Sequence, residues 1–259
     1  MEYDKMKNAL FSVCIVAGMM LGMAGCGSGD SVSDAVEEST QEIVSDETPT
    51  STLPEDVQAA IDAPSSKLSQ ELTNTLAFMG NEERLAYDVY NALYIKYPKV
   101  EQFTKIATNG EYQHIGAVQQ LIQKYKLNDA VSFTNVVDPL GYLNTPIEAM
   151  DAGVYDVPEI QALYTQLMDL ATDEVKALKV GCIIEVVDVN DLTREIAQAQ
   201  SENATDIVTV FSFLRDGSYN HYWAFDKGLK NKGVADGCCA LGLVDGVDYC
   251  HPEYPKNNI

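Results

Sequence analysis

Four long segments of this chain place apolar side chains at spacings of three and four residues, and this helical periodicity constrains the fold most strongly. In the first segment Ser69 fits a helix N-cap and Pro98 ends the pattern. Its stripe consists of Leu72, Leu76, Met79, Glu83, Ala86, Tyr90 and Leu93. Stripes of this width are the buried faces of packed helices, so the periodicity predicts an all-α domain.

The later segments predict further helices over about 101–126, 173–200 and 203–225, with a shorter helix that begins at Pro158. Gly110 lies in the middle of the first of these, where glycine costs about 1 kcal/mol relative to alanine, which indicates close approach by a neighbouring helix.

Two connections are also informative. Asn203 and Asp206 are typical of a capping box at the start of the last helix. Residues 128–157 are rich in turn-forming residues and long for a connection inside a compact domain, which predicts a crossover between two halves of a bundle.

Ionisable side chains that commonly bind metals interrupt every one of the four long stripes. Glu111 and His114 form a Glu-x-x-His pattern, whose two side chains face the same way on a helix. The full set of candidate ligands is Glu83, Glu111, His114, Glu185, Asp188 and His221. Two of the three histidines in the chain therefore fall on buried stripes, which favours one shared site over chance.

A buried charge without a partner costs several kcal/mol, so these side chains need mutual compensation. Two divalent metal ions would supply it, and a mixture of imidazole and carboxylate suits iron or manganese, with zinc also compatible. The competing interpretation is a set of buried ion pairs with Arg84 or Arg194.

Three further residues are candidates to contact the ligand side chains without binding the metal themselves: Glu82, Tyr87 and Ser218. Tyr87 lies one turn after Glu83 and fits a hydrogen-bond partner or a radical relay, but it equally fits a core side chain.

The first 26 residues have the pattern of an export signal. Lys5 and Lys7 precede an apolar run that is short for a transmembrane helix. The run ends in Met23-Ala24-Gly25-Cys26, which resembles a bacterial lipobox with Cys26 as the lipid-modified residue. We therefore expect an exported protein of the cell envelope, anchored to a membrane through this lipid. The alternative is ordinary cleavage nearby, which would release a soluble protein.

Residues 27–66 contain ten acidic and no basic side chains and predict an acidic disordered tether. The folded part then covers 67–233, followed by a tail rich in cysteine and glycine at 234–259. The formal net charge of -22 argues against binding to nucleic acid and against attraction to anionic lipid headgroups. It suits metal cations as partners, whose local concentration it raises.

Export implies an oxidising compartment, where Cys182, Cys238, Cys239 and Cys250 are expected to form disulfides. Because adjacent cysteines rarely bridge each other, pairing within the tail, such as Cys239 with Cys250, is favoured. Cys182 alternatively fits a redox thiol, an inert buried thiol or a disulfide partner of the tail. The tail cysteines with His251 also have zinc-binding residue types, although disulfides are favoured.

The chain resembles the ferritin-like proteins of domain of unknown function family 2202 over about Leu72 to Gly233. The resemblance implies a four-helix bundle with a long crossover between helices two and three. It is carried by Leu76–Met79 with Glu82–Tyr90, by Glu111–His114, by Ile184–Val189 and by Ser218–Phe225.

Ferritin-like di-metal proteins usually supply one glutamate from each of two helices and a Glu-x-x-His from each of the other two. On this pattern the resemblance implies Glu83, Glu111, His114, Glu185 and His221 as ligands. Ser218 stands three residues before His221 in place of the expected glutamate. Asp188 is the candidate replacement, and a site without it would hold one ion or two unequal ones.

The leading hypothesis is a di-iron or di-manganese centre that reduces oxygen or peroxide or oxidises ferrous iron. A second hypothesis is a non-catalytic lipoprotein that sequesters or senses metal, and a third is a metal-free structural bundle. Metal content and turnover separate the three.

Overall fold

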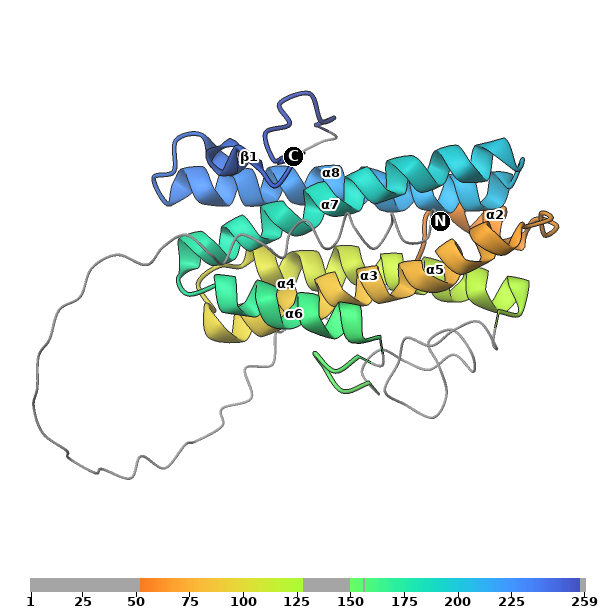
Figure 1. Cartoon of the computed structure of the whole chain (residues 1–259), viewed down its shortest axis with the longest axis horizontal. Coiled ribbons are helices and arrows are strands. Elements are labelled where there is room, and N and C mark those ends of the chain that lie inside the picture. The colour runs from red at the N-terminus through yellow and green to blue at the C-terminus, as the bar shows by residue number, and fades with distance from the viewer. Residues whose placement is uncertain (1–51, 128–149, 156, 257–259) are drawn as a thin grey trace, which may run out of the picture.

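The computed structural model describes residues 52–127, 150–155 and 157–256, and this part of the chain is mostly helical (Figure 1). The predicted all-α class is confirmed. Its helices are α2 (Glu55–Asp62), α3 (Gln70–Lys96), α4 (Gln102–Ile106), the π-helix η2 (Ala107–Glu111), α5 (Tyr112–Tyr125), α6 (Pro158–Leu170), α7 (Glu174–Ser201) and α8 (Thr205–Asn231). The 3-10 helix η5 (Gly237–Leu241) and a hairpin of β1 (Leu243–Val244) and β2 (Val247–Asp248) follow.

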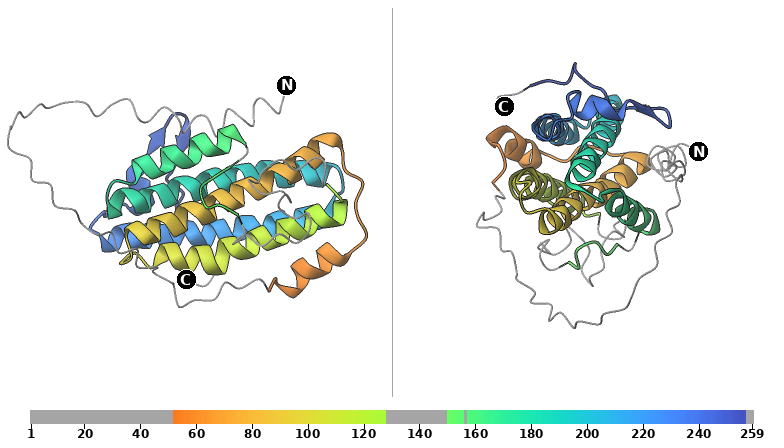
Figure 2. Two further views of the ribbon diagram at one scale, coloured as in Figure 1. Left: turned by 90° about the horizontal axis from the view of Figure 1, so that it is seen from below. Right: turned by 90° about the vertical axis from the view of Figure 1, so that its left-hand side faces the viewer.

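The long helices run alongside one another, as the views in Figures 1 and 2 agree. Helix α7 packs along α8, α3 packs on both α5 and α7, and the shorter α6 lies against α3 and α7. Two apolar clusters fill the interior. On α3 they meet at Glu83, because Leu72 to Met79 belong to one cluster and Leu85 to Leu93 belong to the other.

Helix boundaries follow local capping chemistry in two cases. The Ser69 hydroxyl accepts a 3.0 Å hydrogen bond from the backbone N–H of Leu72, and α3 ends two residues before Pro98. Asp173 caps α7 in the same way through the N–H of Lys176. These side chains satisfy backbone donors that the first turn leaves without a partner.

The predicted capping box at the last helix is wrong. Asn203 has a φ of +57°, and α8 begins at Thr205 without a side-chain cap. Asp206 instead receives hydrogen bonds from Lys124 at 2.6 Å, from Ser66 at 2.8 Å and from the hydroxyl of Tyr125. The Asp206 carboxylate therefore binds these residues from other parts of the fold and does not cap the start of α8.

The segment predicted as a tether is ordered at its end. Residues 55–62 form α2, which contacts α5 and α8, and Val57 and Ile61 bury their side chains at a spacing of four residues. The acidic composition masked this short amphipathic pattern. The export signal, Cys26 and most of the predicted crossover, at 128–149, lie outside the described residues.

Four cysteines, one on α7 and three in the C-terminal tail, form two disulfides. Cys182 on α7 pairs with Cys238 of η5, and Cys239 pairs with Cys250 beyond the hairpin. Cys182 is therefore joined to the tail, and the alternative zinc cluster of the tail is not formed. Within residues 52–127, 150–155 and 157–256, no helix is both long and apolar enough to cross a membrane.

Candidate metal centre

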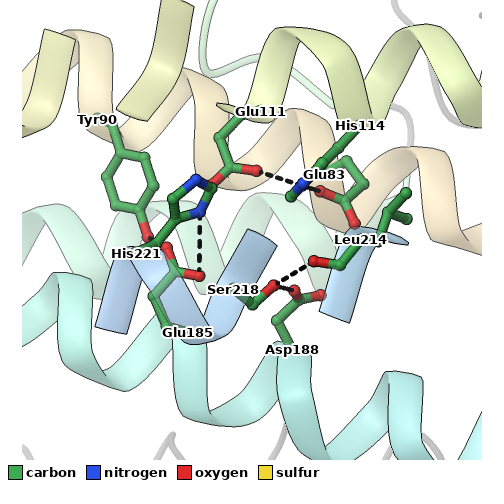
Figure 3. Close-up of polar contacts among 9 residues, drawn as sticks. All are labelled: Glu83, Tyr90, Glu111, His114, Glu185, Asp188, Leu214, Ser218 and His221. Atoms are coloured by element: carbon green, nitrogen blue, oxygen red, sulfur yellow. Dashed lines mark hydrogen bonds and ion pairs between the residues drawn. The ribbon is translucent and has the colours of Figure 1, made fainter. Parts of the chain in front are cut away.

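Five of the six predicted ligands converge from four directions in the interior (Figure 3). They form two groups in which the potential ligand atoms lie within 4.8 Å of one another. The first group is Glu83, Glu111 and His114, and the second is Glu111, Glu185 and His221. Every member is buried, and Glu111 belongs to both groups.

The two oxygens of Glu111 face different histidines. Its Oε2 lies 3.1 Å from Nδ1 of His114, and its Oε1 lies 3.1 Å from Nδ1 of His221. One terminal carboxylate completes each side: Glu83 Oε2 is 3.0 Å from His114 Nδ1, and Glu185 Oε2 is 3.5 Å from His221 Nδ1. The arrangement has the donor set of two adjacent cation sites joined by one carboxylate.

Glycine packing fixes which ring nitrogen faces the carboxylates. A Cβ added at Gly110 would lie 2.3 Å from Nε2 of His221, and one added at Gly217 would lie 2.3 Å from Nε2 of His114. Each Nε2 therefore points at the backbone of a facing helix, and each Nδ1 points at the carboxylates. The close approach predicted at Gly110 is present, and the group that fills it is an imidazole.

The predicted second helix is not uniform, because a π-helix occupies Ala107–Glu111 between α4 and α5. A π-turn adds a residue to the helical repeat and re-aims the side chains that follow, and such turns are frequent at functional sites. Here it ends at Glu111, the residue shared by both groups, and includes Gly110.

Two polar atoms at the centre have no hydrogen-bond partner among the described residues. They are Oε1 of Glu83 and Nδ1 of His221, both buried. An unpaired buried polar group costs about 1–3 kcal/mol, which makes it rare without a compensating ligand. Both atoms belong to the predicted ligand set. Oε1 of Glu83 is unpaired, and Nδ1 of His221 has charge contacts with Glu111 and Glu185 but no hydrogen bond, so both atoms fit a metal-binding role.

The carboxylates of the cluster favour the protonated, positively charged forms of His114 and His221. Burial raises the pKa of the Glu83 carboxyl to about 7. Burial has the same tendency at Glu111, but His221 and His114 outweigh it and hold the Glu111 pKa well below its usual range. Burial would lower the pKa of His221, yet Glu185 and Glu111 raise it to about 10. Protonated imidazoles thus occupy the electrostatic role that cations would otherwise have.

Asp188 and Ser218 contact each other instead of joining either group. The Ser218 hydroxyl lies within hydrogen-bond distance of Asp188 Oδ2 and 3.1 Å from the carbonyl oxygen of Leu214. Burial and the nearby Glu83 and Glu185 raise the pKa of Asp188. Asp188 therefore lies beside the cluster as a buried carboxyl that is hydrogen-bonded to Ser218 and favours its protonated form.

Glu82 belongs to neither group of ligand atoms, although it lines the same pocket as Glu83, Glu111 and Glu185. Burial and the carboxylates of Asp191 and Glu195 raise its pKa, which assigns it to a separate acidic cluster beside the centre. The Tyr87 ring lies 6.2 Å from that of Tyr112 and packs on both apolar clusters, as the core interpretation expected.

The tyrosine that reaches the centre is Tyr90, which the sequence interpretation treated as an apolar member of the stripe. Its buried hydroxyl hydrogen-bonds Oε1 of Glu185. Its ring packs 5.2 Å from that of Phe225 and 6.3 Å from that of Phe103. The available signal was its position seven residues after Glu83, on the same helical face.

Comparison with known proteins shows that the candidate ligands lie within a segment matched by a family model. A family model described as "Uncharacterized protein domain (DUF2202)" matches residues 73–241. The uncharacterized protein MJ0754 of Methanocaldococcus jannaschii is 36% identical over 171 residues, which are 66% of this chain and 81% of that protein. The crystal structure of hypothetical protein MJ0754 from Methanococcus jannaschii DSM 2661 is similar with a TM-score of 0.55 and 35% identity, and the match covers 66% of this chain and 86% of that one. The segment matched by the family model contains all six predicted ligands.

Proposed function

This chain belongs to the DUF2202 family, and we propose that it is a ferritin-like metalloprotein with a two-ion centre of iron or manganese that reacts with dioxygen or peroxide. The observation that carries this proposal is Glu111, whose two oxygens face two different histidines at 3.1 Å each. A carboxylate between two imidazole–carboxylate pairs is the donor arrangement of a bridged pair of ions.

The ligand assignment follows from the contacts. Glu83 and His114 would hold one ion, Glu185 and His221 would hold the other, and Glu111 would bridge them. The mixture of carboxylate and imidazole favours iron or manganese over magnesium or calcium, which prefer oxygen ligands alone.

The ferritin-like comparison rests on helix placement and on this ligand distribution. Helices α3, α5, α7 and α8 lie alongside one another, and each supplies one residue to the cluster. The fifth residue, Glu111, is the last residue of the π-helix η2, directly before α5. The standard pattern has a second Glu-x-x-His. Ser218 stands in place of its glutamate, and Asp188, which is hydrogen-bonded to Ser218, is a carboxylate that could compensate.

When bound, iron or manganese would supply redox chemistry and Lewis acidity. The chain itself contributes three functions. The apolar clusters on both sides bury the centre and limit its contact with water. Gly110 and Gly217 let the two imidazoles pack in one orientation. The Tyr90 hydroxyl holds the Glu185 carboxylate through a buried hydrogen bond. Such supporting contacts orient ligands and tune their basicity.

The test compares the three histidines of the full chain. The His114→Ala/His221→Ala double variant removes both imidazoles of the centre, whereas His251→Ala removes one in the tail, where the ring contacts Glu253 and the backbone of Asp248. After loading with ferrous or manganous ions, bound metal is measured by mass spectrometry and oxidant consumption by stopped-flow spectroscopy.

We expect about two ions per chain and oxidant turnover in the wild type and in His251→Ala, and loss of both in the double variant. Tightly bound metal without turnover of dioxygen or peroxide would contradict an enzymatic function and indicate a metal-sequestering protein. Equal, negligible metal in all three proteins would overturn the proposal and leave a structural bundle.

A further inference from the structure

A pocket between α3, α6 and α7 reaches the carboxylates of the centre. Its volume is about 40 Å³, and five carboxylate residues contribute to its lining: Glu82, Glu83, Glu111, Glu185 and Asp188. The sides are apolar and are formed mainly by Leu85, Leu163, Leu167, Ile184 and Val187. The pocket therefore joins an apolar passage to the ligand cluster.

Helix α6 forms one wall of this passage. Leu163 and Leu167 are a turn apart, and only 7% and 1% of their surfaces are exposed. Helix α7 supplies the opposite side, where Ile184 and Val187 are partly exposed and form the rim. The outer end of the passage is therefore accessible while its inner end is buried.

The size and chemistry of the passage limit what it admits. A single water molecule needs roughly 10–15 Å³ of cavity volume. The pocket, with about 40 Å³, therefore admits only a molecule of a few atoms. An ion that crossed the apolar part of the passage would lose hydration there and would regain partners only at the carboxylates of the lining, which is costly. Peroxide would lose hydrogen bonds with water, whereas dioxygen has none to lose.

We propose that this pocket is the entrance through which dioxygen reaches the centre, and that Leu163 and Leu167 set its width. The inference rests on the proposed function and names the oxidant and its route. Neither leucine has an atom that could bind a metal ion. Both would act on specificity alone, through the width of the passage.

Three variants of the full chain test the route. Leu163→Trp fills the passage and Leu163→Ala widens it, although both disturb the same packing. Ala162→Trp adds the same indole to the exposed face of α6 and is the matched control. Should Leu163→Trp fail to fold, Val187→Trp blocks the partly exposed rim instead.

The first measurement needs no metal. Crystals under xenon pressure should show xenon in the pocket of the wild type and of Ala162→Trp, because dry apolar cavities bind this gas, and should show none in Leu163→Trp. The second measurement is the second-order rate of reaction of the metal-loaded proteins with dioxygen. We expect it to fall at least about tenfold in Leu163→Trp and to be unchanged or higher in Leu163→Ala, with equal metal content.

A wild-type rate in the filled variants, or an equal loss in Leu163→Trp and Leu163→Ala, would overturn the route while leaving the proposed function intact. Reaction of the wild type with peroxide but not with dioxygen would overturn the choice of oxidant. No reaction of the metal-loaded wild type with either would overturn the proposed function, and this inference with it.

Discussion

Nδ1 of His221 on α8 lies 3.1 Å from Oε1 of Glu111 at the end of η2, although α5, α6 and α7 separate the two in sequence. No hydrogen bond is formed at this nitrogen among the described residues. The other oxygen of Glu111 makes the equivalent approach to His114. One carboxylate is thus common to both halves of the cluster, and the remaining ligands belong to one half each.

Replacing the shared carboxylate should therefore remove more metal than replacing a terminal one. We expect Glu111→Gln to lower the affinity for both ions by at least about 10–100-fold and Glu83→Gln to affect mainly one ion. Bound metal per chain, measured by mass spectrometry after dialysis, distinguishes the two. Glu101→Gln, which alters an exposed ion pair with Lys105, is the control and should retain full metal. Equal losses in Glu111→Gln and Glu83→Gln would contradict a bridging role.

A methyl group at either site glycine should displace an imidazole. In Gly110→Ala and Gly217→Ala the new Cβ would lie 2.3 Å from a ring nitrogen, so His221 or His114 must shift. We expect weaker metal binding, measured by calorimetric titration, together with a loss of about 1–3 kcal/mol in the free energy of unfolding from overpacking.

The control for these variants is Gly116→Ala on α5, where an added Cβ meets nothing within 4 Å. It should stabilise the protein by about 0.5–1 kcal/mol, as expected for alanine in place of glycine in a helix interior, without changing metal binding. Weaker binding in Gly116→Ala as well would show that the effect is general to the helix and not to the imidazole contacts.

The helices were predictable from sequence because their periodicity is strong and local. The stripes beginning at Leu72 and after Asp173 identified α3 and α7 almost to the residue. The start of α8 was not predictable in the same way, because Asp206 is engaged by Lys124 and Ser66, which lie far away in sequence. Helix α2 was hidden by the acidic composition around its two buried side chains.

The ligands were predictable because a charged side chain on an apolar stripe is costly and therefore conspicuous. Their pairing was not, because it depends on the π-turn that ends at Glu111 and on helix registers that no local pattern encodes. Tyr90 was missed because a tyrosine fits an apolar stripe with its ring while its hydroxyl reaches Glu185.

The two disulfides should contribute unequally to stability. Cys182 and Cys238 are separated by 56 residues, whereas Cys239 and Cys250 are separated by 11. Since a longer closed loop restricts the unfolded chain more, replacing both cysteines by alanine should cost about 4 kcal/mol for the first pair and about 3 kcal/mol for the second. Urea unfolding of the oxidised proteins measures both losses. A larger loss for the Cys239–Cys250 pair would contradict this entropic account.

Asp206 should stabilise the fold above pH 4 and cease to do so in acid. Burial tends to raise its pKa, but hydrogen bonds from Lys124, Tyr125 and Ser66 outweigh this and lower the pKa below 3.8. A carboxyl whose pKa is lower in the folded state contributes fully above its unfolded pKa, and this contribution disappears as the pH falls through the folded pKa.

We therefore expect Asp206→Asn to cost about 1–3 kcal/mol in the free energy of unfolding at pH 7, as for hydrogen bonds to a charged group. The difference from wild type should shrink at pH 3, because below the ordinary aspartate pKa the carboxyl of the unfolded chain takes up a proton that the folded chain binds less readily. Urea unfolding at the two pH values measures it. Asp169→Asn, at an exposed position on α6, should change stability by less than about 0.5 kcal/mol at either pH. A cost for Asp206→Asn that is the same at pH 3 and pH 7 would show that the carboxylate charge is not what stabilises this contact.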